Sequence, residues 1–413
     1  AMVRPSREPR LGPRPLPLLM AIQSLSALSS LAALPLLRDG SLSWNPSLQS
    51  SASELDPLIR QTIPEDFATA VEAEARRRLS TFADGVAAYQ TAGNSVRPTE
   101  PPAIWSRGSA RLLDYGATAP GAAACLPLLC IPSLINRGYI LDLTERRSLM
   151  RALAADGFRP LLMDWGTPDN EERNYSLTDY IDGHLGDALT FIEDDCGRPP
   201  AVLGYCMGGN LALALAVRRP QSVRALALLA TPWDFQAGHA AAQPFLAALA
   251  PGLETMIANL GILPVDVLQA LFTGLNPALT GAKFRQFADM KKDGEHARQF
   301  VALEDWLNDG VVLSGPVARE CLFDWYLRNT PANGAWQVGG QIVDPAILKH
   351  PTLLMVPGDD YIVPPASAKP LGDVLPNAQL RTVKAGHIGM VAGGRAKSML
   401  YMPLATWLKE NVT

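Results

Sequence analysis

The chain has 413 residues, of which 48% are hydrophobic and 18% are charged, and its formal net charge is -4 at pH 7. This composition indicates a globular protein, and the length suits one large α/β domain with additions. The charge argues against a nucleic-acid-binding surface, which would show clustered lysines and arginines on a basic domain.

The amino terminus carries the one basic run that stands out, and we interpret it as a solvated tail in which four arginines alternate with prolines: Arg4, Arg7, Arg10 and Arg14. The next stretch, LPLLMAIQSLSALSSLAALPLL (residues 16–37), has no charge and resembles a signal peptide or membrane span. It nevertheless contains Gln23 and four serines, and its apolar residues recur at roughly helical spacing. We therefore favour a helix that docks on protein, with contact to a hydrophobic surface as the alternative.

A polar, turn-rich linker (residues 39–51) separates this segment from a second predicted helix (residues 64–89). Pro64 in the first turn, followed by Glu65 and Asp66, favours a helix start. Apolar residues mark one face of this helix: Phe67, Val71, Ala75, Leu79, Phe82, Val86 and Tyr89. Residues 1–100 are thus predicted to form a tail and a helical extension.

After residue 100 the pattern changes to short apolar runs that alternate with amphipathic helices. Near-continuous apolar strands of this kind predict an α/β fold with a mostly parallel sheet and helices on both faces. We assign residues 101–232 and 345–413 to this core, and residues 233–344, rich in tryptophan and proline, to a helical cap. The predicted strands are residues 110–116, 126–132, 158–166, 200–206, 223–232, 350–360 and 380–387, and the helices are residues 148–157, 178–195, 207–219 and 398–410.

The segment GYCMGG (residues 204–209) lies where a predicted strand runs straight into a predicted helix. Such a turn forces positive φ on its apex, Cys206, and small flanking residues prevent clashes there. A helix amino terminus favours a thiolate, so Cys206 is a candidate nucleophile. The backbone N–H of Met207 would form half of an oxyanion hole, and Leu134 or Ser133, after the strand at 126–132, would supply the other half.

A thiol nucleophile needs a base and a group that orients the base. In α/β hydrolases the nucleophile, acid and histidine follow one another along the chain. After Cys206, the loop MVPGDDYIVPP offers Asp359 and Asp360, and VKAGHIGMVAGG offers His387. We predict His387 as the base and Asp360, rather than Asp359, as its partner. The alternative is that Cys206 is a buried core cysteine between chance glycines, which the strand–helix context and the order of the two loops disfavour.

The other cysteines and histidines are predicted to be structural. An odd, sparse set of five cysteines is no disulfide framework, and no metal-ligand spacing occurs, so we expect a reducing cytoplasm and no metal site. The residues assigned to structure are Cys125, Cys130, Cys196, Cys321, His184, His239, His296 and His350.

From about residue 100 to the end, the sequence resembles the polyhydroxyalkanoate synthases, the poly(3-hydroxybutyrate) polymerases of the α/β-hydrolase superfamily. A cysteine elbow with a second glycine and the segment PSLINRGYILDL are the more specific signs. The resemblance rests on PSLINRGYILDL (residues 132–143), DWGTP (164–168), DYI (179–181), GYCMGG (204–209), LLATPWDF (228–235), WLNDG (306–310), DDYIVPPASA (359–368) and GHIGM (386–390).

This resemblance implies an α/β-hydrolase fold and an acyltransferase. Cys206 would accept a 3-hydroxyacyl group from its coenzyme A thioester, which is a substrate, so no cofactor is expected. His387 would deprotonate the thiol and later a hydroxyl group, with Asp360 in support. The implied partners are a polyester granule surface and either a second copy or a separate subunit, in the cytoplasm and without nucleic acid.

Two features depart from that family. The amino-terminal part is intermediate in length between the long and short synthases, and Tyr361 stands where many of them carry histidine. Two alternatives therefore stay open. One is a cysteine hydrolase that cleaves esters, thioesters or stored polyester, and the other is a non-enzymatic protein that coats granules through residues 16–37.

Overall fold

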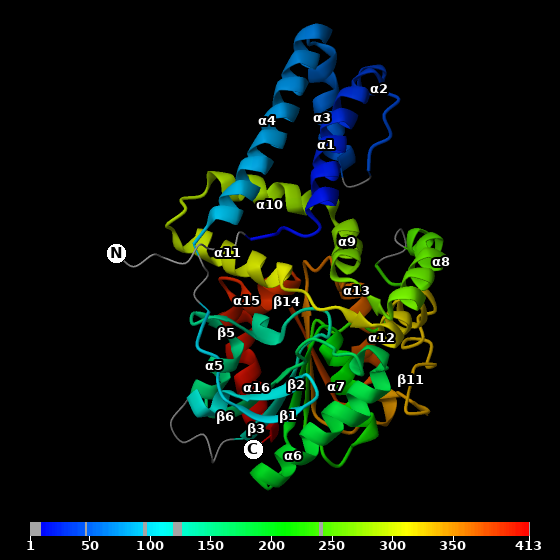
Figure 1. The fold of residues 1–413 in the computed structure, drawn as a ribbon. Helices are drawn as coiled ribbons and strands as arrows, with labels where there is room; N and C mark the ends of the chain where they lie inside the picture. Colours follow the sequence, from blue (N-terminus) through cyan, green and yellow to red (C-terminus); the bar gives the residue numbers. More distant parts are fainter. Residues whose placement is uncertain (1–9, 46–47, 94–96, 119–125, 239–242, 413) are drawn as a thin grey trace. The chain divides into compact units, whose positions relative to one another are not determined.

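The structure is a computed structural model that describes residues 10–45, 48–93, 97–118, 126–238 and 243–412. The chain forms two compact units (Figure 1). One unit combines Ala1–Ser95 with Gln269–Glu304 and is helical, and the other combines Val96–Leu268 with Asp305–Thr413 and contains the main sheet.

The main sheet has eight strands in the order β1-β2-β6-β3-β7-β8-β13-β14. All neighbours from β6 to β14 pair in parallel, whereas β1 and β2 pair antiparallel with each other and β2 is antiparallel to β6. The predicted mostly parallel sheet is therefore confirmed. The strands are β1 (Ala103–Arg107), β2 (Ala110–Asp114), β3 (Leu126–Ile131), β6 (Phe158–Asp164), β7 (Ala201–Tyr205), β8 (Leu226–Leu229), β13 (Thr352–Pro357) and β14 (Ala378–Val383).

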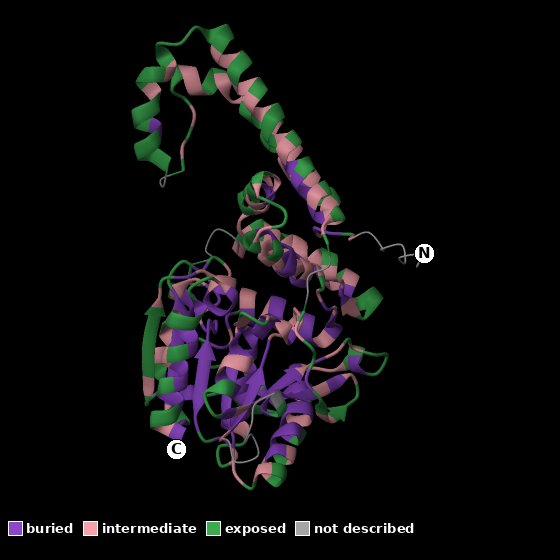
Figure 2. Cartoon of the chain, turned by 90° about the vertical axis from the view of Figure 1, so that its left-hand side faces the viewer, coloured by how far each residue is buried: buried purple, intermediate pink, exposed green. Residues whose placement is uncertain are grey.

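Helices cover both faces of this sheet, with α5 and α16 on one face and α6 and α7 on the other (Figure 1). Residues 207–217 of α7 are all buried, because this helix packs against β7 and β8 in the middle of the sheet. The strands in the middle of the sheet are buried as well (Figure 2). The helices of this unit include α5 (Leu149–Ala155), a π-helical turn (Asp179–Leu185) that continues into α6 (Gly186–Cys196), α7 (Met207–Arg218), α15 (His387–Ala392), and a second π-helical turn (Lys397–Tyr401) before α16 (Met402–Val412).

The helical unit is held together by aromatic residues from distant parts of the sequence. Phe284 contacts Phe82 and Tyr89 edge to face, with ring centroids 6.0 and 5.9 Å apart. A Cβ atom on Gly85 would lie 2.1 Å from the Phe284 carbonyl oxygen, so glycine is needed where these two helices touch. The elements of this unit are α1 (Leu16–Ala32), α2 (Leu34–Asp39), α3 (Gln49–Arg60), α4 (Pro64–Thr91), most of α9 (Val265–Leu275), α10 (Pro277–Asp289) and most of α11 (Glu295–Asn308).

The uncharged stretch at residues 16–37 forms α1 and most of α2. Leu19 is buried against α4 and α10, while Leu25 and Leu28 are 63% and 62% exposed. The first turns of α1 thus dock on protein, and its later turns present leucines to the surface. Within the described ranges, no helix is both long and apolar enough to cross a membrane.

The predicted cap, residues 233–344, is divided between the two units. The helix α8 (Gln243–Leu260), α12 (Gly315–Arg319) and the π-helical residues Glu320–Leu327 belong with the sheet. By contrast, α10 belongs with the amino-terminal helices, because Phe284 and Phe287 cover the apolar face of α4. The two compact units therefore do not coincide with the predicted extension, core and cap.

Candidate active site

The turn between β7 and α7 holds Cys206 with φ 56° and ψ -129°, a backbone conformation that is uncommon for residues other than glycine. The Cys206 N–H donates to the Leu229 carbonyl (2.8 Å), and the Cys206 carbonyl accepts from the Gly209 N–H (2.8 Å). A residue held in such a conformation costs of order 1–3 kcal/mol, which the surrounding structure must offset. The apex therefore has the geometry that the sequence pattern predicts.

The glycines beside the apex are required by close approach of the backbone. A Cβ atom on Gly204 would lie 2.4 Å from the Gly208 carbonyl oxygen. On Gly208 it would lie 2.0 Å from the Ile131 carbonyl oxygen, at the end of β3. The first turn of α7 is thus in contact with the turn that follows β3, from which the second oxyanion donor is predicted.

The two predicted downstream loops bring His387 and Asp360 together. Asp360 follows β13, and its Oδ2 accepts from His387 Nδ1–H at 2.7 Å. Its Oδ1 accepts from the backbone N–H groups of Ile362 (2.8 Å) and Val363 (2.9 Å). The Asp360 side chain is fully buried, whereas Asp359 is exposed. The geometry therefore favours Asp360 over Asp359 as the partner of the histidine.

The imidazole of His387 is hydrogen-bonded to Asp360, and it also interacts with Cys206. Burial lowers the pKa of His387, but the charge of Cys206 and the hydrogen bonds to Asp360 and Cys206 outweigh burial and raise this pKa to about 10. Since Nδ1 is engaged by Asp360, the other ring nitrogen is the one available to the thiol. This arrangement can support a thiolate–imidazolium pair, which is what a thiol nucleophile requires.

The predicted oxyanion residues lie on the two segments that meet at Gly208. Met207 begins α7, and Leu134 is buried in the turn after β3. Their role as hydrogen-bond donors to a substrate oxygen stays a prediction.

Two tyrosines near this group were not singled out by the sequence analysis. The Tyr205 hydroxyl donates to the His387 carbonyl (3.2 Å), and its ring lies 5.2 Å from the imidazole. Burial raises the pKa of Tyr326, and the nearby charges of Cys206, Cys321 and Asp360 raise it further. Neither tyrosine has a local signal, because an aromatic residue in a strand or cap helix looks the same whether it faces a site or a core.

The residues assigned to structure lie in varied settings. Cys130 and Cys321 are buried, and Cys196 is half-buried with its Sγ 3.3 Å from an Arg159 nitrogen. His184 is buried, and its Nε2 lies 3.5 Å from Glu172 Oε1. Cys125 and His239 fall outside the described residues. In the described part of the chain, no group of three or more histidine, cysteine or acidic side chains could hold a metal ion.

The chain is similar to proteins of a known family. A family model described as "alpha/beta hydrolase fold" matches residues 127–393. The chain is 29% identical to the "Poly(3-hydroxyalkanoate) polymerase subunit PhaC" of Allochromatium vinosum, over 81% of this chain and 95% of that protein. The proteins of the same name from Thiocystis violacea (30%; 76% and 89% covered) and a Synechocystis species (33%; 69% and 78% covered) are also similar.

Proposed function

Because the chain belongs to the poly(3-hydroxyalkanoate) polymerase family, within the α/β-hydrolase fold, we propose that it is an acyltransferase that makes polyester from 3-hydroxyacyl-CoA. The catalytic part of the proposal rests on the arrangement of Cys206, His387 and Asp360 at the turn between β7 and α7. Cys206 occupies a strained apex, His387 is hydrogen-bonded to the buried Asp360, and Cys206 is close enough to His387 to raise the pKa of its imidazole.

The proposed first step transfers the acyl group to the enzyme. His387 takes the proton of the Cys206 thiol, and the thiolate attacks the thioester carbonyl carbon. The carbon–sulfur bond to coenzyme A breaks, and the leaving thiolate takes the proton from the imidazolium. The products are acyl-Cys206 and free CoA, and coenzyme A acts only as the carrier of the substrate.

The proposed second step forms the ester bond. His387 removes the proton from the hydroxyl group of a chain end or a second hydroxyacyl group, and the oxygen attacks the carbonyl carbon of acyl-Cys206. The Cys206 thiolate leaves and is reprotonated by the imidazolium. A thioester on Cys206 keeps the acyl group about as activated as it was on coenzyme A, so this step is downhill.

The backbone N–H groups of Met207 and Leu134 are the proposed donors to the oxyanion in both steps. Placed at a helix start and a buried turn, they would need little reorganisation as charge develops. We also propose that the protein works in the cytoplasm at the surface of a polyester granule, which the exposed leucines of α1, Leu25 and Leu28, would contact.

The test is incubation with 3-hydroxybutyryl-CoA, with release of free CoA followed over time and the product analysed by mass. Release of CoA with an oligomeric or polymeric ester supports the proposal. Release of CoA with only free 3-hydroxybutyrate contradicts it and supports a cysteine hydrolase. Absence of CoA release from the folded protein, with or without added polyester primer, overturns the enzymatic proposal and supports a granule-coating protein.

Variants connect the activity to the proposed nucleophile. Cys206→Ala is expected to abolish CoA release, and Cys206→Ser to leave less than about 1% of it, because a hydroxyl group is far harder to deprotonate than a thiol. Cys196→Ala removes a half-buried cysteine elsewhere and is the matched control, expected to keep full activity. Full activity in Cys206→Ala would show that this assignment is wrong.

A further inference from the structure

His387 begins α15, a helix of six residues that the rest of the chain must hold in place, because so short a helix is not stable by itself. Two buried tyrosines donate hydrogen bonds to its backbone. The Tyr205 hydroxyl donates to the His387 carbonyl (3.2 Å), and the Tyr401 hydroxyl donates to the Val391 carbonyl. The first of these bonds ends on the predicted base itself, and the second ends further along the helix.

The aromatic ring of Tyr205 also lies against the side chain of His387. The centroids of the two rings are 5.2 Å apart, and their planes are tilted by 35°. Since Tyr205 is 3% exposed, the two rings are packed together inside the protein, and the imidazole has little room to turn on that side. One residue therefore holds both parts of His387, with its hydroxyl on the backbone and its ring on the imidazole.

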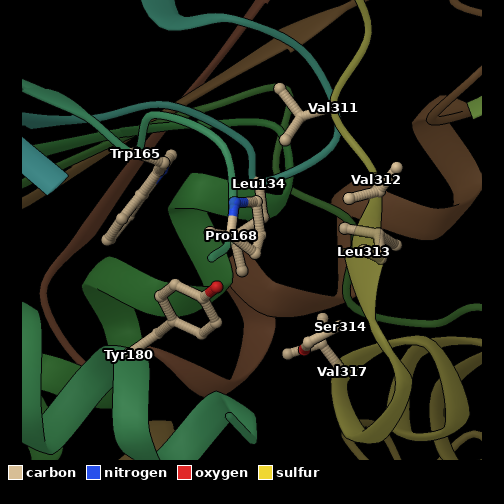
Figure 3. A pocket seen from close by; sticks show the side chains of 9 residues that line it. All are labelled: Leu134, Trp165, Pro168, Tyr180, Val311, Val312, Leu313, Ser314 and Val317. Atoms are coloured by element: carbon tan, nitrogen blue, oxygen red, sulfur yellow. The ribbon is translucent and has the colours of Figure 1, made fainter. Parts of the chain in front are cut away.

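A small apolar pocket lies in the same unit, beside the turn that follows β3 (Figure 3). Its described lining residues include none of Cys206, Asp360 and His387. That pocket thus gives the imidazole no empty volume into which to turn. The position of the imidazole depends on the side chains that pack around it, and Tyr205 is the one that contacts it by its ring.

Tyr205 is itself fixed by the sheet. It is the last residue of β7, which lies between β3 and β8, and it pairs with Leu229 of β8. The next residue, Cys206, donates its N–H to the Leu229 carbonyl (2.8 Å). The predicted nucleophile and the residue that holds the predicted base are therefore consecutive on one strand in the middle of the sheet.

We propose that Tyr205 is a positioning residue, which holds His387 at the distance and orientation from Cys206 that proton transfer requires. This inference rests on the proposed role of His387 as the base. Small displacements of a reacting group slow a reaction strongly, so a fixed base has a direct effect on the rate. Burial raises the pKa of Tyr205, and the charges of Cys206 and Asp360 raise it further, so the hydroxyl keeps its proton and remains a donor at neutral pH.

The test compares Tyr205→Phe, which removes the hydroxyl group and keeps the ring, with Tyr401→Phe as the matched control. Tyr401 is also 3% exposed and also donates to a backbone carbonyl of α15, so its variant makes the same chemical change beside the same helix without a direct effect on His387. The readout is alkylation of Cys206 by iodoacetamide at neutral pH, followed by mass spectrometry of the peptides. Because the thiolate is the reactive form, this rate reports how well His387 takes the proton of the thiol.

Tyr205→Phe is expected to lower the alkylation rate of Cys206 about three- to tenfold, as the loss of one hydrogen bond predicts. It should lower kcat for CoA release from 3-hydroxybutyryl-CoA by a similar factor and leave KM unchanged. Tyr401→Phe should keep both rates within about twofold, although its thermal stability falls as much. Tyr205→Leu, which removes the ring as well, should lower both rates about ten- to a hundredfold, so that phenylalanine restores part of the loss.

Equal alkylation rates in folded Tyr205→Phe and the wild type would overturn the inference. An equal loss in Tyr401→Phe would also overturn it, because a merely structural role would affect both variants alike. Tyr205→Phe decides the question if the leucine variant does not fold. Alkylation needs no substrate, so a wild type that releases no CoA but shows the expected difference in alkylation would overturn the proposed function and support the positioning role.

Discussion

Replacing Asp360 with asparagine removes one charge from the proposed catalytic group and alters little else. The asparagine carbonyl oxygen can still accept from the Ile362 and Val363 N–H groups, as Asp360 Oδ1 does. Its NH₂ group then faces His387 Nδ1, where the carboxylate accepted a hydrogen bond at 2.7 Å. Two donors cannot face each other, so the neutral imidazole must carry its proton on the other nitrogen. In that tautomer it cannot take the proton of Cys206.

The size of this effect follows from the electrostatics of His387. Its rise in pKa from 6.5 to about 10 corresponds to roughly 5 kcal/mol in favour of the imidazolium. Cys206 and Asp360 both contribute to this rise, and Asp360 does so by its hydrogen bond and by its charge, so its loss weakens His387 as a base. The unfavourable tautomer adds to the loss, so we expect kcat to fall by between about 10²-fold and 10⁴-fold.

The assay is CoA release from 3-hydroxybutyryl-CoA, with single-turnover acylation measured separately. Asp359→Asn makes the same chemical change one residue earlier, on an exposed side chain, and is expected to keep its rate within about twofold, as for most surface substitutions. Thermal unfolding of both variants controls for folding. The reasoning is refuted if folded Asp360→Asn keeps more than about a tenth of the wild-type rate, or if Asp359→Asn loses as much.

Four further predictions concern stability. Burial raises the pKa of Glu320 to about 7, with the charge of Asp324 adding and the hydrogen bond from Trp336 opposing. As the pH rises, the unfolded chain loses this proton before the folded protein does, so the free energy of unfolding of the wild type should fall by roughly 3 kcal/mol between about pH 4.5 and 7. Urea unfolding of Glu320→Gln should not show this fall, and the same pH dependence in wild type and variant would contradict the prediction. Gly208→Ala should destabilise the protein by about 2–4 kcal/mol and stop CoA release, since its Cβ would meet the Ile131 carbonyl. Gly274 lies in the helix α9 (Val265–Leu275), and a Cβ atom added there would meet no heavy atom outside its own helix backbone within 4 Å. Gly274→Ala should therefore stabilise the protein by about 0.5–1 kcal/mol, which calorimetry can check. Phe284→Ala should weaken the helical unit by about 3–5 kcal/mol and raise amide exchange in α4 and α10, and unchanged exchange there would count against the role given to this ring.

The sheet and the elbow could be predicted because their signals are local. An apolar run that passes directly into a helix through GYCMGG leaves few conformations open to Cys206. The carboxyl ends of neighbouring parallel strands lie on one edge, so the loops with Asp360 and His387 were expected near each other. The two side chains are in contact, with 2.7 Å between Asp360 Oδ2 and His387 Nδ1. Their chemical roles stay predictions.

The parts that could not be predicted depend on contacts between distant residues. The periodicity of residues 64–89 showed that one face needed a partner, but it did not identify Phe284 as that partner. The helix α3 was not predicted, because its start is rich in serine and it contains Pro57, and both features disfavour a helix in the sequence pattern. The strand β1 has only partly buried or exposed residues, so it lacks the apolar run that marked the others.

The pairing of α4 with α10 has a consequence for synthesis of the chain on the ribosome. Phe82 and Tyr89 leave the ribosome about 200 residues before Phe284, which completes their cluster. At the usual elongation rate of about 5–20 residues per second, Phe82 and Tyr89 remain without Phe284 for roughly 10–40 s. During that interval the strands of the sheet up to β8 emerge and can pair. The helical unit, although it begins first in the sequence, is thus completed after much of the sheet, and its exposed aromatic seam is a natural place for a chaperone to bind the nascent chain.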